Sequence, residues 1–425
     1  MSHGQPRKVC VVGSGGREHA LAHVLARSAD VVVTPGNPGI NGRSAEGFGL
    51  ASTPAPPEEI EADLFVIGPE EPLVGGLADR LRSRGRLVFG PGEDGARLEG
   101  SKEFMKKCAS DAGVPTARWR AFSDPAEATG YLRSLPGPYV VKTDGLAGGK
   151  GVLVTGDLAE AERDVAAKLS GAAFGGAGRR VVIEEALQGT ELSLLVVCDG
   201  ARGVPLAPAQ DYKRFGTGDT GPNTGGMGAV SPVPTATAAV VSSAMDTIVE
   251  PTLRALRKAG IDYRGVLYAG LMLTADGPAL IEFNVRFGDP EAEVVLPRLA
   301  TDLTELLAAA ADGSGSNATL RFVDDAAVAV AVVVRGYPAA PLTGDPIEGL
   351  DEAGSVEGVT VFHAGTRRDE AGTLRTSGGR VLVVTALGAT IETARERAYG
   401  GVARISFAGM QHRHDIAAGI GVAAP

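Results

Sequence analysis

Cysteine is scarce in this chain of 425 residues, which contains only Cys10, Cys108 and Cys198. Their wide spacing excludes a cysteine-rich metal site and a disulfide framework, and it favours a reducing compartment, so we expect a cytoplasmic protein. Long apolar runs are also lacking. The longest, Ala326–Val334, is far shorter than the ~20 residues that cross a bilayer, and Met1–Lys8 has no apolar signal segment, so we expect no membrane association.

Positive charge is in deficit, with 41 Lys and Arg against 51 Asp and Glu and a net charge of -10. This balance argues against a nucleic-acid partner. Lysine is the rarer cation, and none follows Lys258. Because most of the positive charge is Arg, the lysines at 102, 142, 150 and 213 are candidates for sites that Arg cannot fill.

Apolar strands alternate with helices at the start of the chain, at 8–13, 30–34, 63–68 and 86–90. This alternation predicts an α/β domain with a parallel sheet, in which ligands bind at the carboxyl ends of the strands. Loops rich in Gly and Pro follow these strands. They supply the candidate binding residues Gly15, Asn37, Gly68, Pro69 and Glu70.

The first loop, Gly13–Glu18, has two glycines of a dinucleotide fingerprint, but Glu18 occupies the third glycine position. The second strand ends in Thr34, without the acid that would hold a ribose hydroxyl. A nicotinamide oxidoreductase is therefore a weak interpretation. The turn either packs a helix on a strand or forms part of a site for another phosphate-bearing ligand.

A second glycine-rich loop, Lys142–Gly151, lies between two predicted strands. It is not a P-loop, because no Ser or Thr follows Lys150 and no helix follows the loop. Its glycines would let backbone N–H groups approach phosphate oxygens between two flanking lysines. These glycines are Gly148, Gly149 and Gly151. The alternative is a plain hairpin with a long flexible loop.

The segment 181–187 is predicted to be a strand that runs into a connector. Free backbone groups from Glu184 to Leu187 could read the edge of an adenine, and Glu191 could hold ribose hydroxyls. The alternative for Glu184 and Glu185 is solvation at the end of a strand.

The segment 281–291 is predicted to be a strand followed by a helix. Strand alternation places Glu282, Asn284 and Arg286 on one face, and Asp289 is placed to cap the helix. Two oxygen ligands and a cation suit a magnesium ion that carries phosphates. The alternative is the solvated face of an antiparallel strand.

Together these segments resemble the ATP-grasp superfamily and, more closely, the family of phosphoribosylamine–glycine ligases. The resemblance runs nearly end to end, and its last two segments are highly specific in combination. It is carried by Gly13–His19, Pro35–Asn37, Gly68–Glu70, Leu98–Lys102, Lys142–Gly151, Gly221–Gly228 and Arg286–Glu291. It implies an ATP-grasp fold with an N-terminal parallel-sheet domain (1–118), a lid subdomain (119–188), a catalytic subdomain (189–324) and a small C-terminal α+β domain (325–425).

The resemblance also implies a reaction, the second step of de novo purine biosynthesis. Glycine is joined to 5-phosphoribosylamine through glycyl phosphate, ATP is cleaved to ADP and phosphate, and Mg²⁺ or Mn²⁺ is the metal. The implied roles are catalysis by Lys142, Lys150 and Arg286; ATP binding by Lys102, Lys142, Gly148, Gly149, Lys150, Gly151, Glu184, Glu185, Ala186, Leu187 and Glu191; substrate binding by Gly15, Asn37, Gly68, Pro69, Glu70, Asp211, Asn223 and Asp289; and metal binding by Glu282 and Asn284. The expected partners are these small molecules. The expected oligomeric state is a monomer, with a dimer as the alternative.

Two other interpretations stay open, an ATP-grasp ligase with a different acceptor and a catalytically silent nucleotide-binding module. The N-terminal loops distinguish a ligase with a different acceptor from the expected phosphoribosylamine–glycine ligase. Only the phosphoribosylamine–glycine ligase needs a ribose-phosphate site in these loops. The sequence departs from the family pattern at Glu293, where Gln is common. Because its charge would repel a substrate phosphate, Glu293 is left out of the expected site.

Overall fold

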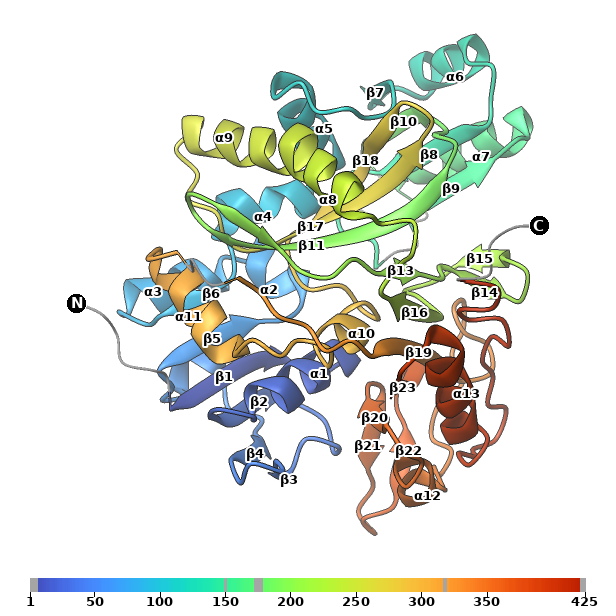
Figure 1. Ribbon diagram of the computed structural model, residues 1–425. Helices are drawn as coiled ribbons and strands as arrows, with labels where there is room; N and C mark the ends of the chain where they lie inside the picture. The colour runs from blue at the N-terminus through green and yellow to red at the C-terminus, as the bar shows by residue number, and fades with distance from the viewer. Residues whose placement is uncertain (1–6, 149–150, 172–178, 316–318, 421–425) are drawn as a thin grey trace.

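The computed structural model describes residues 7–148, 151–171, 179–315 and 319–420, which form four main sheets with helices packed on them (Figure 1). This arrangement confirms the predicted mixed α/β fold class. None of the helices within the described residues is long and apolar enough to span a membrane.

The N-terminal sheet has six strands in the order β3-β4-β2-β1-β5-β6, and the pairs among β4, β2, β1, β5 and β6 are parallel. The strands are β1 (Lys8–Gly13), β2 (Asp30–Pro35), β3 (Gly42–Arg43), β4 (Gly49–Ser52), β5 (Leu64–Ile67) and β6 (Val88–Phe89), and the helices that follow them are α1 (Gly16–Leu25), α2 (Glu70–Val74), α3 (Leu77–Ser83) and α4 (Glu93–Gly100), with a short 3-10 turn at Pro57–Glu59. The predicted parallel sheet is thus confirmed.

A small antiparallel sheet, in the order β7-β10-β8-β9, stands at the top of the molecule in Figure 1. Its elements are β7 (Trp119–Phe122), β8 (Tyr139–Thr143), β9 (Val152–Thr155), β10 (Val181–Glu185), α6 (Pro125–Ser134) and α7 (Leu158–Leu169). Its apolar side chains form a core of their own, which includes Val141, Val165 and Ile183. This core makes the described residues between 119 and 185 a compact unit.

The central sheet has the antiparallel order β12-β11-β17-β18. Its strands are β11 (Thr190–Asp199), β12 (Gly203–Pro205), β17 (Arg264–Thr274) and β18 (Gly277–Asn284), and the helices around it are α5 (Lys102–Asp111), α8 (Ala238–Ala244), α9 (Glu250–Lys258) and α11 (Leu303–Asp312). A π-helical turn, Met245–Val249, joins α8 to α9, so the helix continues through Pro251.

The C-terminal sheet has the order β13-β16-β19-β23-β20 and is accompanied by two short ribbons, β14–β15 and β21–β22. The elements are β13 (Gln210–Asp211), β14 (Arg214–Gly216), β15 (Thr220–Asn223), β16 (Gly228–Ser231), α10 (Ala292–Val295), β19 (Ala326–Val333), α12 (Leu350–Gly354), β20 (Val359–His363), β21 (Thr366–Arg368), β22 (Leu374–Thr376), β23 (Arg380–Gly388) and α13 (Ile391–Val402). Strands β13 and β16 come from the segment expected in the catalytic subdomain, so this sheet crosses the expected boundary at 324.

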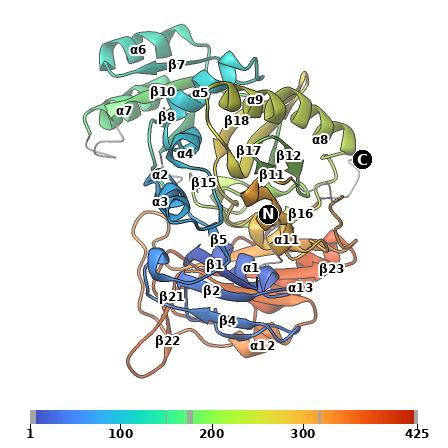
Figure 2. The ribbon, with the colours of Figure 1, turned by 90° about the vertical axis from the view of Figure 1, so that its left-hand side faces the viewer.

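Two hydrophobic cores join the N-terminal sheet to the central sheet. Alternate residues of β1 point into different cores, Val9 into one and Cys10 into the other, as the period of a strand requires. Leu195 and Leu194 of β11 divide in the same way between the same two cores. Figure 2 shows the N-terminal sheet below the central sheet, with α11 between them. The shared cores hold the loops after β1 and β5 against the segment that follows β18.

Candidate active site

Strand β18 carries both predicted metal ligands, Glu282 and Asn284, and is interrupted by a bulge. The register with β17 shifts at Ile281, which has no opposite residue. The Ile281 carbonyl accepts a hydrogen bond from Lys142 Nζ at 3.1 Å. The bulge therefore ties the first lysine of the glycine loop to the strand that carries the two oxygen ligands.

Two details predicted for the segment 281–291 are wrong. The strand ends at Asn284, so strand alternation does not place Arg286. Asp289 does not cap a helix, because α10 begins only at Ala292. Instead, Asp289 Oδ2 pairs with Arg380 Nη2 of β23 at 2.9 Å. A charge-assisted bond thus holds the Asp289 carboxylate against β23 of the C-terminal sheet.

Lys102 and Glu282 form an ion pair, with Lys102 Nζ 2.7 Å from Glu282 Oε2. Ser101 caps α5, which places Lys102 at the first position of the helix. Burial raises the pKa of Glu282, but Lys102, Lys142 and Lys213 outweigh it and hold the pKa far below its usual range. Glu282 is therefore charged, as a carboxylate that binds a metal must be.

Glu184 lies between two lysines. Its Oε1 is 2.9 Å from Lys142 Nζ and its Oε2 is 2.8 Å from Lys106 Nζ. All three side chains are almost fully buried, so solvation at a strand end does not explain Glu184. Burial lowers the pKa of Lys106 to about 8 even beside Glu184, since the neighbouring lysines also oppose its charge. The side chain of Glu184 therefore holds two cations and is not free to bind a ligand.

Lys106 was missed by reasoning from sequence. It lies on α5, and its Nζ also bonds Thr116 Oγ1 at 2.7 Å, while that hydroxyl donates to the Leu280 carbonyl of β18 at 2.7 Å. The scarcity of lysine was the signal that could have found it. A lysine four residues after Lys102 shares its helix face.

The glycine loop starts at Lys142 and is tied to α5. Asp144 Oδ1 accepts hydrogen bonds from Ser101 Oγ and from the Glu103 backbone N–H, both at 3.0 Å. Gly148 has a φ of 55°, which favours glycine, and a side chain there would meet open space. The predicted residues Gly149 and Lys150 lie outside the described residues. Gly151 packs against the side chains of Ala147 and Thr143, so the loop folds back on itself.

The predicted adenine connector follows β10. Glu185 pairs with Arg118 at 2.8 Å on the surface, and Ala186 and Leu187 are half-buried. Glu191, the predicted ribose ligand, pairs with Lys213 at 2.5 Å, and both side chains are partly exposed. The structure thus places the Glu191 and Lys213 side chains together at the start of β11.

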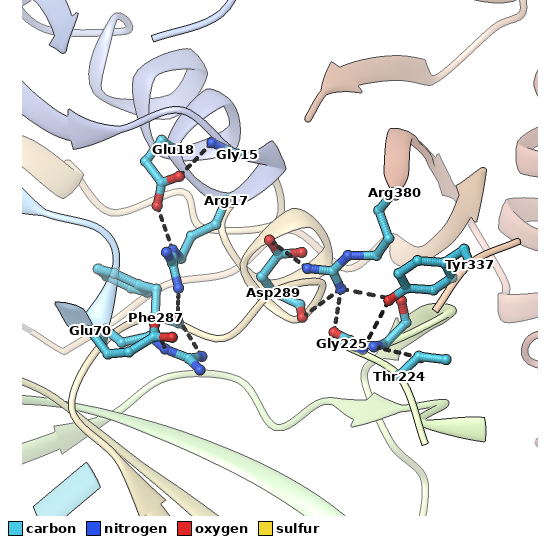
Figure 3. Close-up of polar contacts among 12 residues, drawn as sticks. Gly15, Arg17, Glu18, Glu70, Thr224, Gly225, Phe287, Asp289, Tyr337 and Arg380 are labelled. Atoms are coloured by element: carbon cyan, nitrogen blue, oxygen red, sulfur yellow. Dashed lines mark hydrogen bonds and ion pairs between the residues drawn. The ribbon is translucent and has the colours of Figure 1, made fainter. Parts of the chain in front are cut away.

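Glu18 occupies the first N-terminal loop. Its Oε2 accepts the Gly15 N–H at 2.6 Å, and its Oε1 pairs with Arg17 at 2.5 Å (Figure 3). A side chain at Gly13 or at Gly68 would collide with Glu18. The carboxylate therefore fills the space between the ends of β1 and β5 where a dinucleotide pyrophosphate would need to sit, which argues against the oxidoreductase.

Arg286 joins the N-terminal domain to the segment that follows β18. Its Nε is 3.2 Å from Glu70 Oε2 and its Nη2 is 3.0 Å from Glu99 Oε1. Both Arg286 and Arg17 also donate to the Phe287 carbonyl, each at 3.2 Å. Burial opposes the charge of Arg286, but Glu99 and Glu70 raise its pKa. The structure thus brings together Glu70 and Arg286, which sequence reasoning assigned to different roles.

Asn37 is buried and binds two segments. Its amide donates to the Ser14 carbonyl and to the His363 carbonyl, both at 2.9 Å. Gly68 and Pro69 lie between β5 and α2, in front of Glu70. The amide donors of Asn37 are thus already used within the protein, and what remains for a ligand is the backbone of its loop.

Arg380 closes the side of the site formed by the C-terminal domain (Figure 3). Besides Asp289, it contacts the Gly225 and Gly226 carbonyls, while the Gly225 N–H donates to Tyr337 at 3.0 Å. Asn223, a predicted substrate residue, ends β15 opposite Arg214. The loop Gly221–Gly228 is thus anchored to Arg380 and the C-terminal domain.

Asp211 ends β13 beside a cluster of acids. Burial and the nearby Glu291 and Glu191 raise its pKa to about 7, although Lys213 opposes them. Glu291 accepts hydrogen bonds from Tyr268 at 2.5 Å and from Ser193 at 3.1 Å. This acidic cluster of Asp211, Glu191 and Glu291 suits a small cationic group.

The oxygen donors fit a metal only in part. Within the described residues, no cluster of three or more His, Cys, Asp or Glu side chains could hold an ion by itself. Glu282 and Asn284 together supply one charged and one neutral oxygen ligand. That set suits Mg²⁺, which keeps waters and binds through substrate phosphates.

Comparison with known proteins gives the family. Models of phosphoribosylglycinamide synthetase match the chain in three parts, its N domain over residues 7–99, its ATP-grasp (A) domain over 100–292 and its C domain over 327–419. Among curated relatives, the phosphoribosylamine–glycine ligase of Streptomyces coelicolor is 49% identical over 97% of this chain and 99% of its own length. That of Mesorhizobium japonicum is 47% identical over 96% and 97%.

Solved structures of known proteins support the same family assignment. The crystal structure of phosphoribosylamine–glycine ligase from Thermotoga maritima matches with a TM-score of 0.84 at 36% identity, over 96% of this chain and 100% of that one. The biotin carboxylase domain of the Hydrogenobacter thermophilus 2-oxoglutarate carboxylase matches with a TM-score of 0.71 over 96% and 92%; at 16% identity this shows the fold alone. The predicted ATP-grasp fold and family are confirmed, and the chain belongs to the phosphoribosylamine–glycine ligase family.

Proposed function

We propose that this chain is an ATP-dependent carbon–nitrogen ligase that joins glycine to 5-phosphoribosylamine, giving glycinamide ribonucleotide, ADP and phosphate. The observation that carries the proposal is the contact of Arg286 with Glu70 at 3.2 Å. It brings the end of β18, beside Glu282 and its lysines, to the N-terminal loops. A phosphoryl donor and an acceptor that bind on the two sides would meet at Arg286.

ATP would lie between the small antiparallel sheet and β18. Lys102 and Lys142, held by Glu282 and Glu184, are the cations for its phosphates. The backbone after Glu184 would meet the adenine, and Glu191 the ribose. We propose that residues 119–188 act as a lid over the nucleotide, since their sheet has a core of its own. Gly149 and Lys150 would belong to this lid.

Glu282 and Asn284 would hold Mg²⁺, or Mn²⁺, together with ATP phosphates. The metal would neutralise phosphate charge during transfer. The lysine cluster supplies the rest of the positive charge, and such positioned charges are the main catalytic contribution in phosphoryl transfer. Occupancy of the metal site should therefore depend on bound nucleotide.

The acceptor side is formed by the loops around Gly15, Asn37 and Gly68–Glu70. We place the phosphoribosylamine there, with Asn223 and Asp289 closing the far side. Glycine would bind near Asp211, which with Glu291 can receive its ammonium group. The glycine carboxylate would then face Arg286, the cation next to Glu291 of this acidic cluster.

Two steps complete the reaction. A glycine carboxylate oxygen attacks the γ-phosphorus of ATP, the bond to the ADP oxygen breaks, and glycyl phosphate forms. The amine nitrogen of phosphoribosylamine then attacks the glycyl carbonyl carbon, phosphate leaves, and the nitrogen loses a proton. Arg286 is placed to neutralise the charge on the transferred group in both steps. Burial of the site would protect glycyl phosphate from water.

We propose that the protein acts as a monomer, with a dimer as the alternative. We place it in the cytoplasm, since all three cysteines are unpaired. Analytical ultracentrifugation would separate the monomer from the alternative dimer.

The test is ADP release with glycine and freshly generated phosphoribosylamine, omitting each in turn. We expect ADP release only when both are present, and glycinamide ribonucleotide as the product. Turnover that does not depend on phosphoribosylamine would refute the assignment of the acceptor and favour a ligase with another amine.

A further inference from the structure

Glu293 is a buried carboxyl group without a hydrogen-bond partner. The side chain has no exposed surface, and neither of its oxygens is bonded within the part of the chain that the structure describes. Burying an ionised carboxylate without donors carries a large free-energy cost, which is avoided when the group takes up a proton.

Its neighbours do not supply the missing donors. The nearby cations are Arg380 on β23 and Arg17 on α1. Arg380 is bonded to Asp289 and to the Gly225 and Gly226 carbonyls. Arg17 is bonded to Glu18 and to the Phe287 carbonyl. Both cations are thus engaged elsewhere.

A second carboxyl lies nearby. Asp289 carries the charge that pairs with Arg380, and its Oδ1 is buried and likewise without a partner. After burial, Asp289 is the largest cause that raises the pKa of Glu293, well above its usual range. The facing charges are therefore one carboxylate, Asp289, and two engaged guanidinium groups.

Glu293 also touches the acceptor side of the site. It lies on α10, which packs on α1 and on β23. A Cβ on Gly16, the first residue of α1, would be 2.6 Å from Glu293 Oε1 and 3.4 Å from Val383. The carboxyl therefore lies directly against the turn that includes Gly15, between that turn and the C-terminal domain.

We propose that Glu293 is a neutral carboxylic acid that serves as a positioning residue, holding the Gly15–Glu18 turn in place for the phosphate-bearing substrate. Loss of its proton would put a second negative charge beside Asp289 and against the turn. That charge would weaken binding of a phosphate ester there and disturb the packing of α1 on α10. The effect on substrate rests on the proposed function, whereas the neutral state of Glu293 does not.

Thermal unfolding without substrate tests the neutral state. In the unfolded chain Glu293 ionises above its ordinary pKa, but the folded chain must keep it protonated. Stability is therefore lost as pH rises from the ordinary pKa towards the raised one. Glu293→Gln has the same shape and no proton to lose, so its advantage over the wild type should grow with pH.

We expect the two Tm values to agree within about 1 °C at pH 5.5 and Glu293→Gln to be higher by at least about 2 °C at pH 8.5. Glu305→Gln, at an exposed position of α11, is the matched control and should show no such trend. A Glu293→Gln protein that is less stable at every pH, or differs by a constant amount, would overturn the proposal.

Kinetics test the positioning role. Wild type and Glu293→Gln share every other titrating group. The ratio of their KM values, or of their kcat values, at each pH therefore reports on Glu293 alone. Above the pH at which the Tm difference stops growing, where folded Glu293 has lost its proton, the wild-type KM for phosphoribosylamine should be about threefold or more higher relative to the variant than below that pH, with a constant kcat ratio. A kcat ratio that changes while the KM ratio does not would refute positioning. A protein that fails to use phosphoribosylamine at any pH would refute the proposed function and leave the Tm result standing.

Discussion

Lys142 Nζ lies 2.9 Å from Glu184 Oε1, and both side chains are almost completely buried. The pair crosses from β8 to β10 of the small sheet, while Lys142 also bonds the bulged carbonyl of Ile281 on β18. One ammonium group therefore links the small sheet to the strand that carries Glu282. This link is where nucleotide binding and catalysis meet in the proposed mechanism.

Replacing Lys142 by Ala should reduce kcat/KM for ATP by about 100-fold or more, since it removes a positioned phosphate donor. The fold should survive, because Glu184 keeps Lys106 as a partner. ADP release measures the loss of ATP use, and circular dichroism checks that the fold survives. Lys107→Ala is the control, since that lysine is exposed and pairs with Glu103 at 3.1 Å. Unchanged ATP use in Lys142→Ala would refute its role.

Replacing Glu282 by Gln should raise the Mg²⁺ concentration needed for half-maximal turnover by about tenfold or more, because the proposed metal site would lose its charged ligand. The amide keeps a hydrogen-bond acceptor for Lys102. A Mg²⁺ titration of ADP release at saturating ATP measures the change. Glu103→Gln, on the neighbouring helix α5, tests whether loss of any nearby acid has the same effect. An unchanged Mg²⁺ requirement in Glu282→Gln would remove it from the metal site.

Replacing Arg286 by Lys should lower kcat by about 100- to 1000-fold with little change in KM for ATP, because a lysine cannot reach Glu70 and Glu99 together. Rapid-quench measurement of ADP formation isolates the phosphoryl-transfer step. Arg133→Lys, at an exposed pair with Glu162, is the matched control. If the loss appeared in the KM for ATP alone, Arg286 would be a nucleotide ligand instead.

The sequence predicted the loops of the site better than the contacts between them. Glycine and proline after buried apolar strands place Gly15, Asn37 and Glu70 at one edge of a parallel sheet, because the topology of such a sheet fixes that edge. The contact of Glu70 with Arg286 joins residues far apart in the chain, and no local pattern encodes it.

Local propensity also failed where tertiary contacts compete with it. Asp289 has the sequence context of a helix cap, but Arg380 draws its carboxylate away from that position. Glu184 has the context of a strand end facing water, yet two lysines bury it. Glu293 is left out of the expected site because its charge would repel a substrate phosphate, whereas the packing of α10 on α1 removes it from water.

Asp211 gives the last prediction, which concerns pH. Its pKa is raised to about 7, mainly by burial, so its charge is present above that pH and is lost below it. The glycine ammonium stays protonated between pH 6 and 8, so the KM for glycine should rise about tenfold as pH falls across this range. Asp211→Asn should have a high KM that no longer depends on pH, and Asp246→Asn, at an exposed position, should behave as the wild type. A wild-type KM for glycine that stays constant from pH 6 to 8 would exclude Asp211 as the ammonium partner.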